Sequence, residues 1–421
     1  MFALQSWGNA GPGWWFLPID GGWDGEQSEA KVAGRRSPAV RPGPREASSE
    51  PSGCVPARLR LAPLTGLARI VAFGQSTPPA YDQIMLWRDY YADQVGHHGV
   101  AERVWRRADV RTRHLTACPV HEDVWRWSTA QRMRRFLDDA LPLAKEAVGT
   151  ALVAATLTPE EVGLLATVSC TGYANPGLDV YVAKDLGMRP EVRRLAVGHM
   201  GCYAAIPGLA VATDYVIAQG RPAVLVCTEL PSLHVQPPPH DTQQAVAHAL
   251  FADACAALVL APSQIVGEGL DVIAVETLTD VSSTADMTWD ITDHGFRMSL
   301  SPRVPALVAR NVPTLVDRLL TDRGLAPDDV RHWAIHPGGP RIIDKVQEVF
   351  SLSDVQIKRS RDILSRYGNC SSATILLTLA SICPVPVGDY VLAMAFGPGL
   401  TVTGALLQGA ATPKPTHAQP G

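Results

Sequence analysis

The stretch AVGHMGCYAAIPGLAVATDYV, residues 196–216, places one cysteine between an apolar segment and a run of small residues. Gly201 precedes Cys202, and the residues after the thiol have the composition of a buried helix. A buried free cysteine usually fills space, whereas a cysteine at a helix N-terminus meets the positive end of the helix dipole, which favours the thiolate. The stretch alone leaves packing and chemistry open as roles for Cys202.

The same pattern returns later in the chain. GCYAAIPGLAVA at Gly201 is matched by GNCSSATILLTL at Gly368, an offset of 167 residues. TPEEVGLLATVSC and APDDVRHWAIHPG begin 168 residues apart, as do GRPAVLVCTEL and GDYVLAMAFGP. Three segments repeated at nearly one offset predict two similar α/β halves, in which Cys202 corresponds to Asn369.

Hydrophobic periodicity supports the α/β class. Short apolar runs such as VGLLATVS, PAVLVCTE, CAALVLAP and YVLAMAFG have the length of buried strands. YDQIMLWRDYYADQV and AQRMRRFLDDALPLAKEAVGTALVAA have apolar residues at the three- and four-residue spacing of amphipathic helices. Pro207 is expected to kink the helix that follows Cys202.

Composition excludes several classes of protein. The 421 residues are 46% hydrophobic and 19% charged with a formal net charge of −4, and no long basic block suggests nucleic-acid binding. No run of eighteen apolar residues or secretory leader is evident, so no membrane partner is expected. Eight scattered cysteines without a CxxC pair argue against a disulfide framework and a zinc site. We expect a soluble cytoplasmic protein without a metal.

Four segments are predicted along the chain. Residues 1–60 contain seven Pro and nine Gly, which indicates a disordered N-terminal extension over 1–62. The two halves are predicted over 63–270, with the candidate nucleophile, and 271–410. Residues 411–421 are expected to be a flexible tail.

Other candidate groups have two interpretations each. His336 ends an apolar run before Pro-Gly-Gly, where it is presented at a loop edge or caps the next helix. Asn369 precedes Ser-Ser and an apolar run, as an N-cap or as an amide donor for a developing oxyanion. Cys170 also ends a strand-like run and is a competing thiol that could line a pocket.

GHMGCYAA, IHPGGPRIID, RYGNCSSATILL and AFGPGLTV resemble, in order and spacing, the signature segments of type III polyketide synthases. These chalcone synthase-like enzymes belong to the thiolase superfamily. The resemblance runs from about Ala68 to Leu407 and is closer to the bacterial members than to the plant members. It implies a thiolase fold of five αβαβα layers, usually as a homodimer. It also implies a triad of the nucleophile Cys202 with His336 and Asn369.

The resemblance further implies positions in the substrate pocket. ALFAD resembles the family's ALFGD segment, which makes Phe251 the gate phenylalanine, with Ala252 in place of the usual glycine. Pro231 stands where the family often has Thr or Cys, so the starter and product are left open. The other implied pocket positions are Met298, Ser371 and His234, and Arg103 and Arg107 fall near the basic residues that grip coenzyme A phosphates.

The implied reaction joins malonyl-CoA to an acyl-CoA starter held on Cys202 by decarboxylative Claisen condensation, and no cofactor is expected beyond these two substrates. Cyclisation is expected to give an alkylpyrone or alkylresorcinol-type product. The alternatives are a ketoacyl synthase III-like enzyme of fatty-acid synthesis, a Cys-His-Asn hydrolase, and a catalytically silent acyl-CoA binder. GPGLTV, with Pro398, favours the polyketide group over the ketoacyl synthases.

Overall fold

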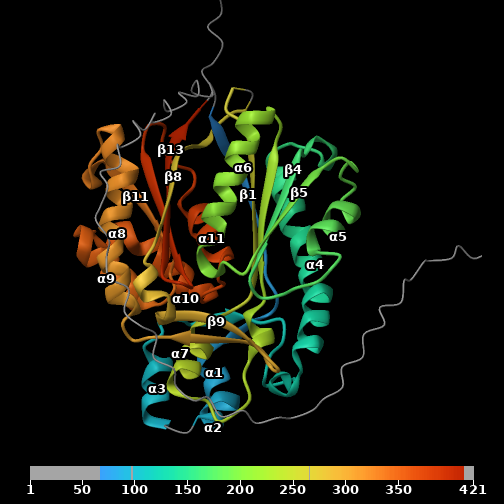
Figure 1. Ribbon diagram of the computed structural model, residues 1–421, viewed down its shortest axis with the longest axis vertical. Helices are drawn as coiled ribbons and strands as arrows, with labels where there is room; N and C mark the ends of the chain where they lie inside the picture. Colours follow the sequence, from blue (N-terminus) through green and yellow to red (C-terminus); the bar gives the residue numbers. More distant parts are fainter. Residues whose placement is uncertain (1–66, 96–97, 265, 412–421) are drawn as a thin grey trace, which may run out of the picture. The chain divides into compact units, whose positions relative to one another are not determined.

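The computed structural model describes residues 67–95, 98–264 and 266–411 (Figure 1). The predicted extension over 1–62 lies outside the described residues, and so does the predicted tail apart from residue 411.

A nine-stranded mixed sheet is the frame of the fold, in the order β11-β12-β13-β8-β1-β7-β6-β4-β5. Its first half consists of β1 (Ala68–Ser76), β4 (Leu164–Ser169), β5 (Arg193–Gly198), β6 (Ala223–Glu229) and β7 (Ala254–Pro262). Its second half consists of β8 (Gly269–Thr279), β11 (Val330–Ile335), β12 (Tyr390–Gly397) and β13 (Thr401–Ala410).

The strand order confirms the duplication. The series β4-β6-β7-β1 is mirrored by β11-β12-β13-β8, and the two series meet where β1 pairs antiparallel with β8. At this seam the Arg69 guanidinium binds the Asp271 carboxylate, with Nε and Oδ1 2.7 Å apart and both side chains largely buried. Each half also has a parallel pair, β4 with β6 and β11 with β12.

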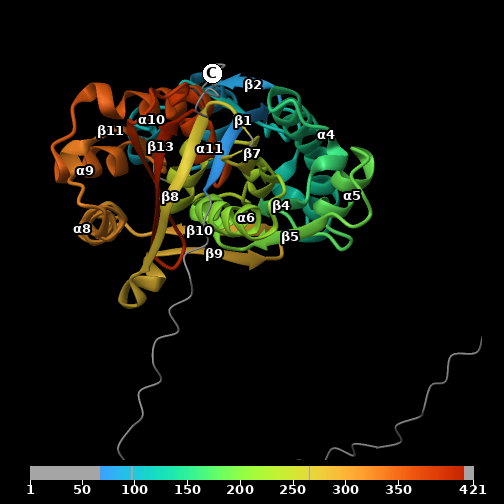
Figure 2. The same ribbon diagram turned by 90° about the horizontal axis from the view of Figure 1, so that it is seen from above.

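Helices form three layers around the two halves of the sheet. In Figure 1, α4 (Thr129–Ala154) and α5 (Leu178–Asp185) cover one outer face, and α8 (Val304–Leu320) and α9 (Pro340–Phe350) cover the other. Figure 2 shows α6 (Ala205–Gln219) and α11 (Ala373–Ile382) between the two halves. This is the predicted five-layer αβαβα arrangement.

The central layer forms because α6 and α11 consist mainly of small and aliphatic residues. A Cβ on Gly208 would lie 2.9 Å from Leu225 Cδ1, so α6 packs closely on the sheet. The expected kink at Pro207 is wrong, because Pro207 lies in the first turn of α6, where its missing N–H has no helical acceptor to lose. Gly201–Gln219 is long and apolar enough to cross a membrane, but 56% of it is buried, as in a core helix.

Several of the remaining elements lie at one end of the sheet, where Figure 1 labels α1 (Gln83–Leu86), α2 (Ala92–Gln94), α3 (His98–Arg106), α7 (Thr242–Leu250) and β9 (Met287–Thr292). A hairpin of β9 and β10 (Gly295–Leu300) runs across this end, and α7 packs against both β10 and α3. The helix expected over 81–95 is three consecutive helical segments over 83–94. The other elements are α10 (Asp354–Tyr367) and the short strands β2 (Ala80–Asp82) and β3 (Thr112–His114).

Candidate active site

Cys202 lies in a tight turn between β5 and α6. The turn is a single 3-10 segment, Gly201–Tyr203, and the thiol side chain is buried. Gly201 has a φ of +79°, and a Cβ there would lie 2.5 Å from the Pro398 ring. Only glycine suits this position, because it tolerates the left-handed backbone and leaves room for the loop after β12.

Asn369 is the equivalent residue of the second half and is held by backbone on both sides. Its N–H donates to Leu250 O at 2.8 Å, and its carbonyl accepts from Ala252 N at 3.0 Å. Its side-chain oxygen accepts from Ser371 N at 2.9 Å, while Nδ2 donates to Gly338 O at 3.3 Å. The oxygen therefore caps the turn before α11, as one interpretation predicted, and the amide nitrogen is directed toward the loop after His336.

His336 follows β11 directly, and its backbone N–H donates to Met394 O of β12 at 2.8 Å. The ring is 1% exposed, and neither ring nitrogen has a hydrogen-bond partner within the described part of the chain. It therefore does not cap α9. Burial lowers the pKa of His336 to about 3, so the imidazole is neutral at physiological pH.

Gly338 and Gly397 lie close to the three predicted residues. Asn369 Nδ2 binds the carbonyl of Gly338, and a Cβ on Gly338 would lie 3.6 Å from His336 Nε2. A Cβ on Gly397, at the end of β12, would lie 3.3 Å from the backbone nitrogen of Cys202. Asn369 is therefore linked to the loop after His336, and Cys202 lies beside the end of β12, the strand that accepts a hydrogen bond from the His336 N–H.

Burial and side-chain hydrogen bonding from Ser371 and Asn369 have opposite effects on the pKa of the Cys202 thiol. Burial raises the pKa to about 12, although this hydrogen bonding acts to lower it. The thiolate expected from the helix N-terminus is therefore not the resting form, because the loss of solvation outweighs the helix dipole. Attack by this sulfur requires a base.

Cys202 lines a small cavity. We call it the Cys202 cavity. Four predicted pocket residues contribute to its wall: Pro231, Phe251, Met298 and Ser371. The wall also includes Cys170, Thr171 and Trp289.

A buried carboxylate lies behind Cys170. Glu229, at the end of β6, accepts hydrogen bonds from Cys170 N at 3.0 Å, from Thr171 Oγ1 at 2.8 Å, and from the hydroxyl of Ser372. Cys170 Sγ is 3.5 Å from the same carboxylate and 3.2 Å from Ser371 Oγ. Desolvation raises the pKa of Glu229. This network was not predicted, although an acid at the end of the apolar run PAVLVCTE was a signal for it.

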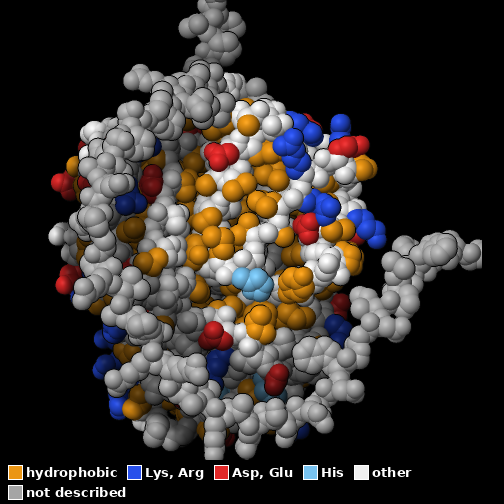
Figure 3. All heavy atoms as spheres, viewed as in Figure 1, with side chains coloured by type: hydrophobic (Ala, Val, Ile, Leu, Met, Phe, Trp, Pro, Cys, Tyr) orange, Lys and Arg blue, Asp and Glu red, His pale blue; other side chains and the backbone are white. Residues whose placement is uncertain are grey.

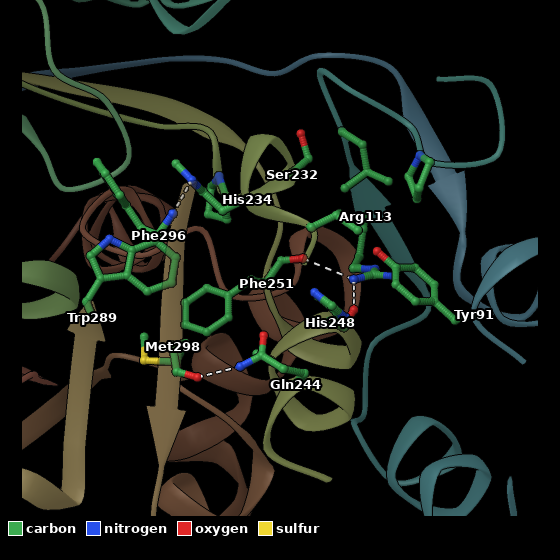
Figure 4. Close-up of a pocket in the computed structure, with 15 residues that line it drawn as sticks. Tyr91, Arg113, Ser232, His234, Gln244, His248, Phe251, Trp289, Phe296 and Met298 are labelled. Carbon is green, nitrogen blue, oxygen red and sulfur yellow. Dashed lines mark hydrogen bonds between the residues drawn. The ribbon is translucent and has the colours of Figure 1, made fainter. Parts of the chain in front are cut away.

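A second cavity, which we call the Arg113 cavity, shares Pro231, Phe251, Trp289 and Met298 with the first. Figure 4 shows Trp289 and Phe296 on one side of it, Arg113 and Tyr91 on the other, and Phe251 between them. No pattern in the sequence indicated a second cavity.

His234 is in the wall of the Arg113 cavity rather than beside the thiol. Its Nδ1 accepts from the N–H of Phe296 at 3.0 Å, so Nε2 carries the proton and donates to Thr171 O at 2.7 Å. Burial lowers the pKa of His234 to about 3. The neutral ring of His234 therefore links the β9–β10 hairpin to the loop after β4 by two hydrogen bonds.

The two predicted coenzyme A residues lie apart from both cavity walls. Arg103, on α3, and Arg107, just after it, are exposed, and neither makes an ion pair within the described residues. The helix α3 packs on α7, which supplies Gln244, Ala247 and His248 to the Arg113 cavity. The two arginines are thus available at the surface behind that helix.

Comparisons with known families decide the identity. The family model described as "Chalcone and stilbene synthases, N-terminal domain" matches residues 59–263, and the corresponding C-terminal domain matches residues 272–411. The chain is a type III polyketide synthase. It is therefore an acyltransferase of the chalcone synthase-like group, as the motifs predicted, and the ketoacyl synthase III alternative is not favoured.

Bacterial relatives agree with this assignment. "Alpha-pyrone synthesis polyketide synthase-like Pks18" of Mycobacterium tuberculosis is 34% identical over 368 residues, 83% of this chain and 93% of the relative. "1,3,6,8-tetrahydroxynaphthalene synthase" of Streptomyces peucetius is 34% identical over 73% of this chain and 82% of that relative. Among solved structures, PKS-I from the brown alga Ectocarpus siliculosus superposes with a TM-score of 0.77 at 28% identity, covering 82% and 99% of the two chains.

Proposed function

We propose that this type III polyketide synthase condenses malonyl-CoA onto an acyl starter bound to Cys202 and cyclises the product to an alkylpyrone or alkylresorcinol type. The observation that carries the proposal is that Cys202 lines a cavity and that, while burial raises the pKa of its thiol, side-chain hydrogen bonding from Asn369 lowers it. A nucleophile and a carbonyl-binding donor set thereby share one site.

Loading of the starter is the first step. His336 accepts the Cys202 proton as the sulfur attacks the thioester carbon of the acyl-CoA. A new S–C bond forms, the bond from carbon to the coenzyme A sulfur breaks, and the proton passes to the departing sulfur. His336 is free to accept this proton because its ring is neutral and both ring nitrogens lack partners among the described residues.

Extension is the second step. In malonyl-CoA, the bond to the terminal carboxylate breaks, CO₂ leaves, and its electron pair forms an enolate at the thioester. Asn369 Nδ2 and the His336 ring each donate a hydrogen bond to the enolate oxygen. A neutral imidazole has one N–H group, so His336 can donate this bond without being protonated. The enolate carbon then attacks the acyl-Cys202 carbonyl and the sulfur departs. No cofactor beyond the coenzyme A substrates is needed.

The product class is supported by two observations. The Mycobacterium tuberculosis relative is described as acting in alpha-pyrone synthesis. The walls around Cys202 and Phe251 are mainly apolar, as an aliphatic starter requires. Arg103 and Arg107 are proposed to bind the coenzyme A phosphates, because they are exposed cations behind α7 and make no ion pair within the described chain.

Mass spectrometry of products from malonyl-CoA with acyl-CoA starters of graded length tests this function. We expect pyrones or resorcinols that carry the starter's alkyl group, formed without any carrier protein. Condensation only from malonyl-carrier protein would contradict the proposal and favour the ketoacyl synthase alternative.

We further propose a cytoplasmic homodimer. The strand β5 is an edge of the sheet, and several of its side chains are exposed. Figure 3 shows hydrophobic side chains gathered over the region of α6, where Val211 is 45% exposed. The cysteines of the described chain are unpaired, as in a reducing compartment. Light scattering of the purified protein should give twice the chain mass, and V211K should lower it.

A further inference from the structure

Arg113 is a buried cation that makes no ion pair within the described chain, although the charge of the buried Asp253 carboxylate acts on it. The side chain is 1% exposed. Its Nη1 donates to the carbonyl oxygens of His248 and of Phe251, the latter at 3.1 Å. Asp253 is occupied elsewhere, since its oxygens accept from Thr116 N at 2.7 Å and Ser232 N at 2.8 Å.

Two of the Arg113 nitrogens, Nε and Nη2, have no hydrogen-bond partner among the described residues. The guanidinium also lies 4.8 Å from the Trp105 ring centroid, but a π face does not satisfy N–H donors in the way an oxygen does. A buried donor on a charged group is costly to leave unpaired, so this site favours an acceptor from outside the chain.

His248 provides a second unpaired donor in the same wall. The ring is 8% exposed, and its Nε2 accepts from the N–H of Gln236 at 3.4 Å. Since burial lowers the pKa of His248 well below its usual range, the neutral ring carries its proton on Nδ1. That Nδ1 has no partner among the described residues. Figure 4 shows His248 next to Arg113 in the Arg113 cavity.

The rest of the cavity is largely apolar and adjoins the Cys202 cavity. Phe251, Trp289 and Met298 are walls of both cavities, so a chain that passes them extends from Cys202 toward Arg113. Leu115 and Val235 continue the apolar wall. Methylene groups therefore match the middle of this path, and an oxygen anion matches its end.

We propose that the Arg113 cavity binds the far end of the acyl starter and selects starters that end in a carboxylate, which Arg113 and His248 bind through their unpaired donors. This inference rests on the proposed function, because it assigns a substrate class to the same condensing site. It changes the expected product from an alkyl to a carboxyalkyl pyrone or resorcinol.

Matched pairs of starters test the proposal in the intact enzyme. Suberoyl-CoA and octanoyl-CoA have eight acyl carbons each and differ only in the terminal carboxylate, and adipoyl-CoA and hexanoyl-CoA form a shorter pair. With malonyl-CoA as extender, kcat/KM for the carboxylated member should exceed that of its partner by about tenfold, as one charged hydrogen bond provides. In H248L and R113K this ratio should fall toward one in both pairs.

Controls separate the possible failures. L115V alters the same wall without removing a donor, so it should change both members of a pair alike. Circular dichroism identifies any variant that fails to fold, and H248L leaves the Arg113 contacts to backbone in place if R113K is unstable. Equal use of both members by the native enzyme, or a ratio unchanged in folded H248L and R113K, would overturn the inference. Loss of condensation with every starter would instead refute the proposed function.

Discussion

Asn369 Nδ2 donates to the carbonyl oxygen of Gly338 at 3.3 Å, which ties the turn before α11 to the loop after His336. Because its Oδ1 is held by Ser371 N, the amide cannot rotate freely and presents its N–H groups in one direction. Asn369 thus combines a structural cap with a fixed donor, so its replacement tests the two roles together.

N369A should impair decarboxylation of malonyl-CoA much more than loading of the starter. Loss of one oxyanion donor costs on the order of 10²–10³ in rate, whereas loading depends first on Cys202. Release of labelled CO₂ and acylation of the protein are measured separately. N311A removes an amide in α8 as a control. Equal losses in both steps would indicate that Asn369 acts through the fold and not as an oxyanion donor.

The two thiols at the cavity provide the second prediction. C202A should abolish the acyl adduct seen by intact-protein mass spectrometry, because the carbon–sulfur bond then cannot form. C170A should retain the adduct, since Cys170 is fixed between Ser371 and Glu229 and burial raises its pKa well above the usual range. An adduct that maps to Cys170 in the native enzyme would reverse the assignment.

The sequence predicts the two similar halves of the fold because hydrophobic periodicity and the offset between repeated segments can be read directly from it. Positive φ at both Gly201 and Gly368 explains why a glycine precedes Cys202 and Asn369 alike. The motifs of the family resemblance also predicted Phe251, Met298 and Ser371, which line the Cys202 cavity. The contacts of Glu229 could not be predicted, because segments near residues 170, 229 and 371 meet only after the two halves pack.

The same reason applies to the second cavity. Its wall combines Tyr91, Arg113, His248 and Phe296, which come from widely separated parts of the chain. No spacing relates these residues. His234 was expected in the substrate pocket, but the sequence did not show that both of its nitrogens are used by backbone. Side-chain direction, and not residue type, was the missing information.

Trp289 lines both cavities and provides the third prediction. Its Nε1 donates to Cys170 O at 2.7 Å. W289A should widen the path between the two cavities and shift the preferred starter toward longer chains, measured as relative product yield across a length series. W289F keeps an aromatic ring but loses the hydrogen bond, so it should retain the native preference. An unchanged length profile in folded W289A would show that Trp289 does not limit the path.

The fourth prediction concerns acid stability and the buried His234. Its pKa is about 3 in the fold, against about 6.5 in an unfolded chain, so below pH 6.5 the unfolded state binds the extra proton. The stabilisation that the neutral His234 adds to the free energy of unfolding is complete above pH 6.5 and is lost as the pH falls toward 3. Between pH 7.5 and 5 this loss amounts to about 2 kcal/mol in the free energy of unfolding.

H234Q removes that titration while keeping an N–H that can donate to Thr171 O. It should be less stable than the native enzyme at pH 7.5, because the Phe296 N–H loses its acceptor. Its further loss between pH 7.5 and 5 should be smaller by about 2 kcal/mol, measured by urea unfolding at both values. H332Q, which changes a partly exposed histidine beside Asp389, is the control. Equal pH dependence in H234Q and the native enzyme would show that His234 is not neutral in the fold.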